Sequence, residues 1–271
     1  MDIAAIAQEL KSAYAERRML PVPLSAREPG FDLDAAYAVE AELARLRRAE
    51  GRNTVGRKVG YASKAVWRAL KLETLVWAQM YDHTVQLTGG SEASLSLGSM
   101  CAPKIEPEIV FRLREPPVGD LSSPAAILAC VEWLALGFEI VDSVFAGWTF
   151  QPSDFVAAYG LHAALVVGEP QPIDAARIPA LAEELAAFPV RLRRNGDVVA
   201  EGSGRNSLRS PALCLGELAA AIARRAGSEP LRAGELVSTG SLTEPQPVTP
   251  GETWTASVEQ LGLPDLTLRT T

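Results

Sequence analysis

The chain has few histidines and cysteines and lacks a segment that could carry it into or across a membrane. It contains only His83 and His162, and its three cysteines are scattered over 271 residues. An odd number of widely spaced cysteines gives no disulfide framework and suits reduced thiols. No cationic lead precedes an apolar N-terminal segment, and acidic Glu132 and Glu139 break the apolar run at 124–140. We expect a cytoplasmic protein without a membrane partner.

A basic stripe is also missing. The net charge of −7 opposes attraction to nucleic acid and to anionic lipid. The densest basic cluster, residues 45–48 (RLRR), lies in an apparent helix among glutamates, which favours a solvated helical face. We therefore expect no nucleic-acid partner.

Two common enzyme signatures are absent as well. No Gly-x-Ser-x-Gly motif occurs, and the cysteines lack a recognisable histidine partner, so covalent catalysis is disfavoured. The glycines at 202–204 (GSG) fit neither a dinucleotide nor a P-loop spacing. The order of elements is not a βαβ rhythm, which argues against a doubly wound nucleotide-binding sheet.

What is present is the composition of a folded protein, with 48% apolar residues. Apolar residues at helical spacing over 2–17, and a second helix that Asp32 or Asp34 can cap, predict an N-terminal helical segment over 1–54. Short strands dominate from 55, so we predict an α+β catalytic domain over 55–271. Further predicted elements are a loop over 21–30, helices over 62–73, 124–133 and 212–225, and a hairpin at Asn195-Gly196.

Two glutamates in the segment 104–111 (KIEPEIVF) are the first candidates for chemistry. A strand would project Glu106 and Glu108 to one face while Ile105 and Ile109 occupy the other. Paired carboxylates need water or a cation for compensation, although an exposed polar face explains an isolated pair equally simply. Pro107 suggests a strand start or an edge.

Glu139 changes the balance between these interpretations. It lies in the apolar segment 134–141 (LALGFEIV), where an unpaired buried carboxylate would be costly. Three carboxylates without a histidine cluster suit an oxygen-seeking ion, Mg²⁺ or Mn²⁺ with Ca²⁺ as a possible substitute. We predict that Glu106, Glu108 and Glu139 bind such a metal.

The order of several segments resembles the fumarylacetoacetate hydrolase superfamily, in its 2-keto-4-pentenoate hydratase and 4-oxalocrotonate decarboxylase branch. The resemblance covers nearly the whole chain and depends on 34–37 (DAAY), 56–60 (GRKVG), 104–108 (KIEPE), 138–143 (FEIVDS) and 234–240 (GELVSTG). It implies a mixed β-roll with flanking helices, a self-associating enzyme, and a 2-oxo acid or its dienol as substrate. A metal held by the three glutamates would act as Lewis acid and template for such a substrate.

The resemblance also suggests roles for residues around the metal. Lys58 of the GRKVG segment would pair with the substrate carboxylate or a developing enolate oxygen, although a structural salt bridge to a glutamate is the alternative. Thr239 and Gly240 would line the same pocket, while a plain turn from a strand explains them equally well.

Two departures from the family pattern leave the acid or base open. With 70–77 in helical register, the acidic residue common in the hydratases falls at Val76. Asp82 and His83 lie nearby in sequence, and His83 could exchange protons near neutral pH. Ala158 stands where relatives commonly carry polar groups.

In the same segment, Tyr159 and His162 are candidates for substrate contacts, with core packing as the simpler role.

These features together predict a metal-dependent hydratase of a 2-hydroxydienoate or 2-oxoalkenoate in degradation of an aromatic or related compound. The alternatives are decarboxylation of a 2-oxo-enedioate, carbon–carbon bond hydrolysis of an acylpyruvate-like substrate, and a non-enzymatic oligomeric binding module with a structural metal.

Overall fold

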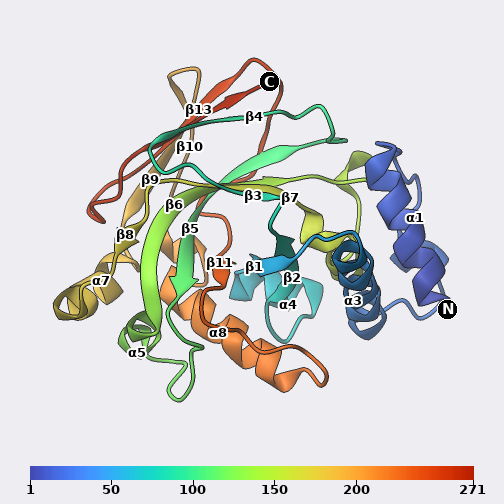
Figure 1. Cartoon of the computed structure of the whole chain (residues 1–271), viewed down its shortest axis with the longest axis horizontal. Helices are drawn as coiled ribbons and strands as arrows, with labels where there is room; N and C mark the ends of the chain where they lie inside the picture. Colours follow the sequence, from blue (N-terminus) through green and yellow to red (C-terminus); the bar gives the residue numbers. More distant parts are fainter.

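Two β-sheets form the centre of the molecule in a computed structural model that describes residues 1–271 (Figure 1). The larger sheet has nine strands: β1 (Thr54–Gly60), β2 (Val76–Tyr81), β3 (Val85–Leu87), β5 (Lys104–Leu113), β6 (Val131–Val141), β7 (His162–Val167), β8 (Gln171–Pro172), β11 (Leu236–Ser238) and β12 (Gln246–Pro247). Their main order is β2-β1-β11-β5-β6-β7-β3, with β12 beside β5 and β8 beside β6. The sheet is mixed: β1 pairs with β11 and β3 with β7 in parallel, the other neighbours of this order are antiparallel, and no βαβ unit repeats.

The smaller sheet has five strands: β4 (Glu92–Leu95), β9 (Pro189–Arg194), β10 (Asp197–Ser203), β13 (Thr253–Val258) and β14 (Leu266–Thr270). Their order is β10-β9-β13-β14-β4. Asn195 and Gly196 connect β9 to β10 with φ values of 52° and 94°. Two consecutive positive φ angles match the right-handed twist of a hairpin, so the predicted turn is confirmed.

The helices form two groups around the larger sheet. The N-terminal group is α1 (Ile3–Ala15), α2 (Leu24–Arg27) and α3 (Leu33–Ala49), joined by α6 (Pro152–Ala157). The remaining helices are α4 (Lys64–Leu70), α5 (Pro124–Ala129), α7 (Ile178–Glu184) and α8 (Pro211–Arg224). In Figure 1, α1 and α3 lie on one side of the molecule, and α5, α7 and α8 lie below and to the other side. None of the helices is long and apolar enough to cross a membrane.

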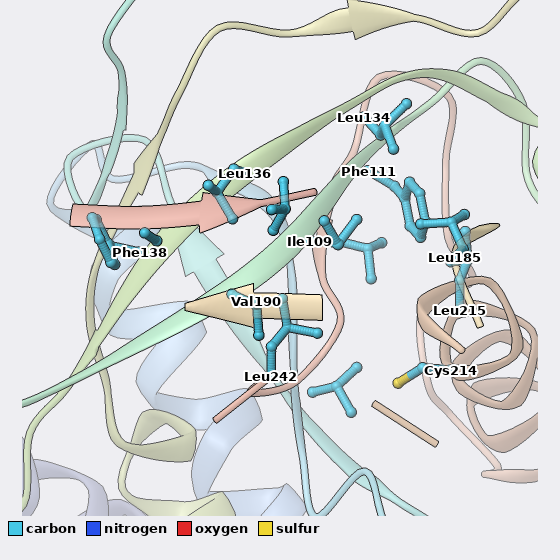
Figure 2. Packing of buried hydrophobic residues seen from close by; sticks show 14 of the residues in the cluster. Ile109, Phe111, Leu134, Leu136, Phe138, Leu185, Val190, Cys214, Leu215 and Leu242 are labelled. Carbon is cyan, nitrogen blue, oxygen red and sulfur yellow. The ribbon is translucent and has the colours of Figure 1, made fainter. Parts of the chain in front are cut away.

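The principal core lies between the two sheets and the helices α5, α7 and α8. Figure 2 shows Ile109 and Phe111 of β5 in the same cluster as Phe138 of β6, Val190 of β9 and Leu215 of α8. A second apolar cluster joins α1, α3 and α6 to β2 and β6. The predicted α+β class and the flanking helices are confirmed, whereas the division of the chain at residue 54 stays a prediction.

Three predicted elements differ from the structure. The helix expected around 70–77 is wrong, because α4 ends at Leu70 and Lys71 adopts a left-handed conformation with φ of 56°. Val76 instead begins β2, where it pairs with Gly60. The helix expected over 124–133 ends at Ala129, and β6 begins two residues later. The loop expected over 21–30 contains the short helix α2.

Pro107 does not mark an edge of the sheet, since β5 is an interior strand. It lies where the neighbour on one side changes from β11, which pairs at 110–112, to β12, which pairs at 104–105. The Pro107 carbonyl points to this side and accepts a hydrogen bond from Leu242 N at 2.9 Å. Pro107 therefore interrupts the ladder at a gap that already exists there.

Gly56 is required where β1 meets β11. A Cβ at this position would lie 2.0 Å from the carbonyl oxygen of Leu236. We expect Gly56→Ala to lower the free energy of unfolding by about 2–3 kcal/mol, because a backbone atom cannot give way easily. Urea unfolding of both proteins measures this. Gly90→Ala is the control, since its Cβ would meet nothing within 4 Å, and equal losses in the two variants would contradict the expectation.

Candidate metal centre and active site

The three predicted glutamates meet on one face of the larger sheet. Glu106 and Glu139 are direct partners in the antiparallel ladder between β5 and β6, and Glu108 lies two residues along β5. One carboxylate oxygen from each side chain lies within 4.8 Å of the others. Glu108 and Glu139 are fully buried, whereas Glu106 is partly exposed. Sheet periodicity thus places three negative charges in a single group.

Lys58 joins this group from a strand that is not a neighbour of β6. Its Nζ lies 3.0 Å from Glu139 Oε2 and donates a hydrogen bond to the carbonyl oxygen of Gly160 at 3.0 Å. Two strands, β11 and β5, stand between β1 and β6. In a flat sheet this separation would be about 14 Å, beyond the reach of a lysine. The contact therefore depends on the strong curvature of the sheet.

Burial and charge act on Lys58 in opposite directions. Burial lowers the pKa of its ammonium, but the carboxylates of Glu139, Glu106 and Glu108 outweigh burial and raise that pKa above its ordinary value. These carboxylates therefore favour the charged ammonium of Lys58 and its role as a hydrogen-bond donor.

Glu108 is held from the end of β11 and the turn that follows it. Its Oε2 accepts hydrogen bonds from Ser238 Oγ at 2.5 Å and from Gly240 N at 2.9 Å, while its Oε1 is buried without a partner. Burial, followed by the charges of Glu139 and Glu106, raises the pKa of Glu108 well above its ordinary value. Such an oxygen in an acidic cluster is suited to a cation.

Gly240 lines the site as predicted from the resemblance, but through its backbone amide. Thr239 points elsewhere, because its Oγ1 donates a hydrogen bond to Ile109 O at 2.8 Å. Ser238, which directly contacts Glu108, had no role in the sequence interpretation. The signal that could have identified it was its place beside Thr239 in the segment 234–240, which carries the resemblance.

His162 stands behind Glu139. Its Nδ1 lies 2.9 Å from Glu139 Oε1, and its Nε2 lies 2.9 Å from Thr84 Oγ1. Burial lowers the pKa of His162, and because a carboxylate oxygen only accepts, Nδ1 of the ring donates to Glu139. Despite burial, Lys58 and His162 together keep the pKa of Glu139 below its ordinary value. His162 therefore orients Glu139, as partners of metal ligands commonly do.

The acidic group borders a cavity of about 850 Å³. Lys58, Glu106 and Gly240 line this cavity, together with aromatic side chains. Its aromatic lining consists of Tyr61, Trp148, Phe150 and Phe155. The combination of one charged corner and an extended apolar wall suits a small organic acid.

Three other predicted residues lie outside this cavity. His83 and Tyr159 line a separate cavity of about 340 Å³ that His162 also borders. Tyr159 is buried, with the guanidinium of Arg47 3.7 Å from its ring centre. Asp82 lies in the turn after β2 and accepts a hydrogen bond from Asn53 N at 3.0 Å. The structure does not bring Asp82, His83 and Tyr159 to the acidic group.

The contact of Arg47 with Tyr159 also corrects the view of 45–48 as a solvated face. Arg47 lies over Tyr81 as well, 4.3 Å from the ring centre, and its Nη1 is buried. Only part of the basic cluster faces water, because α3 turns this arginine toward the aromatic residues of the second apolar cluster.

Buried carboxylates beside a cavity that suits an organic acid are typical of enzymes that bind a divalent cation next to the substrate. The family model described as fumarylacetoacetate (FAA) hydrolase C-terminal matches residues 53–268. The chain belongs to the fumarylacetoacetate hydrolase family. The branch predicted from the sequence is also confirmed by its relatives.

The chain is 30% identical to 2-hydroxyhexa-2,4-dienoate hydratase of Comamonas testosteroni, over 94% of this chain and 93% of that protein. It is 31% identical to 2-keto-4-pentenoate hydratase 2 of Dechloromonas aromatica (strain RCB), over 95% and 94%. The structure of 4-oxalocrotonate decarboxylase from Pseudomonas putida G7, complexed with magnesium and adipate, matches with a TM-score of 0.87 and 25% identity, covering 99% of this chain and 97% of that one.

These relatives are lyases, and this chain is an enzyme of the same class with a small-molecule substrate. Its membership corrects the non-enzymatic alternative. The predicted type of cofactor, a divalent cation, is confirmed by the acidic group together with the magnesium in the related structure.

Proposed function

We propose that this enzyme hydrates a 2-hydroxydienoate, or the 2-oxoalkenoate derived from it, in the degradation of an aromatic or related compound. The observation that carries the proposal is the joining of Glu106, Glu108, Glu139 and Lys58 at one end of a cavity with an aromatic wall. Support comes from two hydratases that match over almost their whole length.

Glu106, Glu108 and Glu139 would hold Mg²⁺ or Mn²⁺, since hard cations prefer carboxylate oxygens and the unpartnered Glu108 Oε1 is available. A cation bound there supplies Lewis-acid stabilisation of negative charge on the C2 oxygen of a 2-oxo acid. Ser238 and Gly240 hold Glu108 in position, and His162 does the same for Glu139.

Lys58 contributes a second positive charge at the same end of the cavity. Its ammonium donates a hydrogen bond to the substrate carboxylate or to the C2 oxygen as that oxygen becomes anionic. In the reaction, protonation of the dienol carbon chain gives an unsaturated ketone, and water then adds to the carbon–carbon double bond conjugated with it. The aromatic wall keeps the chain of the substrate apart from bulk water until this addition.

The resemblance places an acidic residue of the hydratases at position 76, where this chain has an apolar group. Val76 is buried opposite Gly60, beside Phe155. We therefore propose that the wall near Gly60 shapes the substrate and does not exchange protons. Asp82 and His83 gain no support from their positions.

Decarboxylation of a 2-oxo-enedioate is the second candidate, favoured by the close structural match to 4-oxalocrotonate decarboxylase. Both reactions require stabilisation of an anionic C2 oxygen, so the acidic group alone does not separate them.

A turnover assay separates the candidates and tests the metal requirement. With Mg²⁺, we expect loss of the dienol absorbance of 2-hydroxypenta-2,4-dienoate and formation of the 4-hydroxy-2-oxo acid. Treatment with EDTA should lower the rate at least about 100-fold, and added Mg²⁺ should restore it. Release of CO₂ from 2-oxohex-3-enedioate without hydration of the dienol would show that the enzyme is a decarboxylase and not a hydratase. Release of two acids from an acylpyruvate-like substrate would indicate hydrolysis of its carbon–carbon bond.

We also propose that the enzyme is a cytoplasmic homo-oligomer. Its three cysteines are unpaired, which suits a reducing compartment. Size-exclusion chromatography with light scattering would measure the number of subunits.

A further inference from the structure

The segment 204–209, between β10 and α8, forms part of the cavity that contains Glu106. Its backbone and small polar side chains are anchored on the site itself. Leu208 N donates to Ala62 O at 2.8 Å, Asn206 Nδ2 donates to Leu242 O at 2.7 Å, and Ser207 Oγ donates to Thr239 O at 2.5 Å. The segment is thereby fixed to the same turn that holds Glu108.

Leu208 and Arg209 adopt left-handed conformations, with φ values of 46° and 72°. Such conformations cost roughly 1–3 kcal/mol each for residues with a side chain and persist only where surrounding contacts impose them. Here the hydrogen bonds to Ala62 and Thr239 impose them. Arg209 is consequently placed on the cavity by a built turn, and not by a freely moving loop.

The arginine side chains of this segment have no protein partner. Neither Arg205 nor Arg209 makes an ion pair or a side-chain hydrogen bond, and the same is true of Lys64 at the start of α4, which also lines the cavity. Of the acidic residues near them, Glu201 is bound to Arg191 at 3.1 Å. Three cations therefore line the cavity without an ion-pair partner.

The other charged residues of the cavity lie toward the acidic group. Glu244 and Lys104 both act electrostatically on Glu106, and Lys104 also lies 4.0 Å from the ring centre of Trp148. Lys58 is buried and Glu106 is partly buried, whereas Arg205 and Arg209 are exposed. The cavity thus has an acidic floor for a cation, an aromatic wall, and a cationic mouth.

From this arrangement we infer that the substrate carries a second carboxylate, at the end of the chain remote from its 2-oxo acid group, and that Arg205 and Arg209 bind it. The substrate class is an unsaturated 2-oxo dicarboxylic acid or its dienol. The inference deepens the proposed function and rests on it for the placement of the 2-oxo acid group. Planar guanidinium groups suit a terminal carboxylate, which each can bind through two parallel hydrogen bonds. Lys64 adds a point charge beside them.

Two unreactive ligands test the inference through binding alone. 2-Oxohexanoate and 2-oxohexanedioate differ only in a terminal methyl group against a terminal carboxylate. Titration calorimetry with the Mg²⁺-loaded enzyme should give at least about tenfold tighter binding of the diacid, as expected for charge-assisted hydrogen bonds. In Arg205→Gln/Arg209→Gln this preference should fall below about threefold, with the affinity for the monoacid unchanged. Binding of the diacid by the wild type should weaken with added salt.

A second double variant with the same net charge tests whether the total charge of the protein causes the preference for the diacid. Arg52→Gln/Arg68→Gln removes two exposed arginines that do not line the cavity, and it should keep the wild-type preference. Equal binding of the two ligands by the wild type, or an unchanged preference in Arg205→Gln/Arg209→Gln, would overturn the inference.

Failure of the proposed function gives a different result. If the diacid is preferred but no dienol is hydrated, the proposed hydration is wrong, whereas the binding of a second carboxylate by Arg205 and Arg209 is supported. If dienols are hydrated with no preference for a second carboxylate, the function stands and the inference is wrong.

Discussion

Glu108→Gln should abolish high-affinity binding of Mg²⁺ and lower kcat by at least about 1,000-fold. The substitution keeps the shape of the side chain, and the amide oxygen can still accept from Ser238 Oγ and Gly240 N. It removes one of three negative charges whose oxygens lie within 4.8 Å. The loss of a carboxylate ligand should therefore exceed any loss of packing.

Without a bound metal, Glu108→Gln should be more stable than wild type. Wild type without a cation bears the mutual repulsion of Glu106, Glu108 and Glu139, so Glu108→Gln should unfold at a higher temperature than wild type in EDTA. With Mg²⁺ the order should reverse, because a ligand present at 100 times its Kd stabilises the native state by about 2.7 kcal/mol. Thermal melting with and without Mg²⁺, and titration calorimetry with Mg²⁺ or Mn²⁺, measure both effects.

The same group sets the pH dependence of metal binding. Burial, aided by Glu139, raises the pKa of Glu106 to about 7, although Lys58 opposes this. Because the folded-state pKa is above the unfolded one, Glu106 favours the metal-free fold at low pH, and this contribution is lost as pH rises through about 7. Protons compete with the metal over the same range, so Mg²⁺ affinity should be higher at pH 8 than at pH 6.

Exposed Glu73→Gln, outside the cavity, is the matched control and should behave as wild type in each measurement. If Glu108→Gln bound Mn²⁺ as tightly as wild type, the three glutamates would not form the metal site.

The residues of the acidic group could be found from the sequence because they depend on local geometry and on the resemblance. Alternation along a strand puts Glu106 and Glu108 on one face whatever the tertiary structure, and the apolar flanks of Glu139 require a compensating partner. The strands and the hairpin at Asn195 follow from similarly local patterns. These local patterns predict the structure correctly because they depend on neighbouring residues and little on long-range contacts.

Contacts that depend on which strands are neighbours in the sheet could not be predicted in this way. The contact of His162 with Glu139 depends on the register of β6 and β7, and the support from Ser238 depends on β11 lying beside β5. Asp82 and His83 were chosen for closeness along the chain, but the end of α4 at Leu70 places them beyond β2. Arg209 gave no signal, since its left-handed conformation is imposed by tertiary hydrogen bonds.

Lys58→Met should separate catalysis from metal binding. Methionine fills nearly the same volume, so the side chain can still pack on Phe155, whose ring centre lies 4.9 Å from the Lys58 ammonium. The substitution removes the charge that partly neutralises Glu139, 3.0 Å away. Affinity for Mg²⁺ should therefore stay equal or increase, because the metal then meets a more negative group.

Catalysis by the same variant should fall sharply. The ammonium is the one cationic side chain that contacts the acidic group, and it can donate to an oxygen that becomes anionic only during the reaction. Loss of such a donor commonly lowers kcat by about 100- to 1,000-fold, so kcat should fall much more than substrate binding. Steady-state kinetics at saturating Mg²⁺, with Lys71→Met as an exposed control outside the cavity, measures this separation. If kcat at saturating Mg²⁺ is retained while the affinity for Mg²⁺ falls, Lys58 is a structural counter-ion of Glu139 and does not act on the substrate.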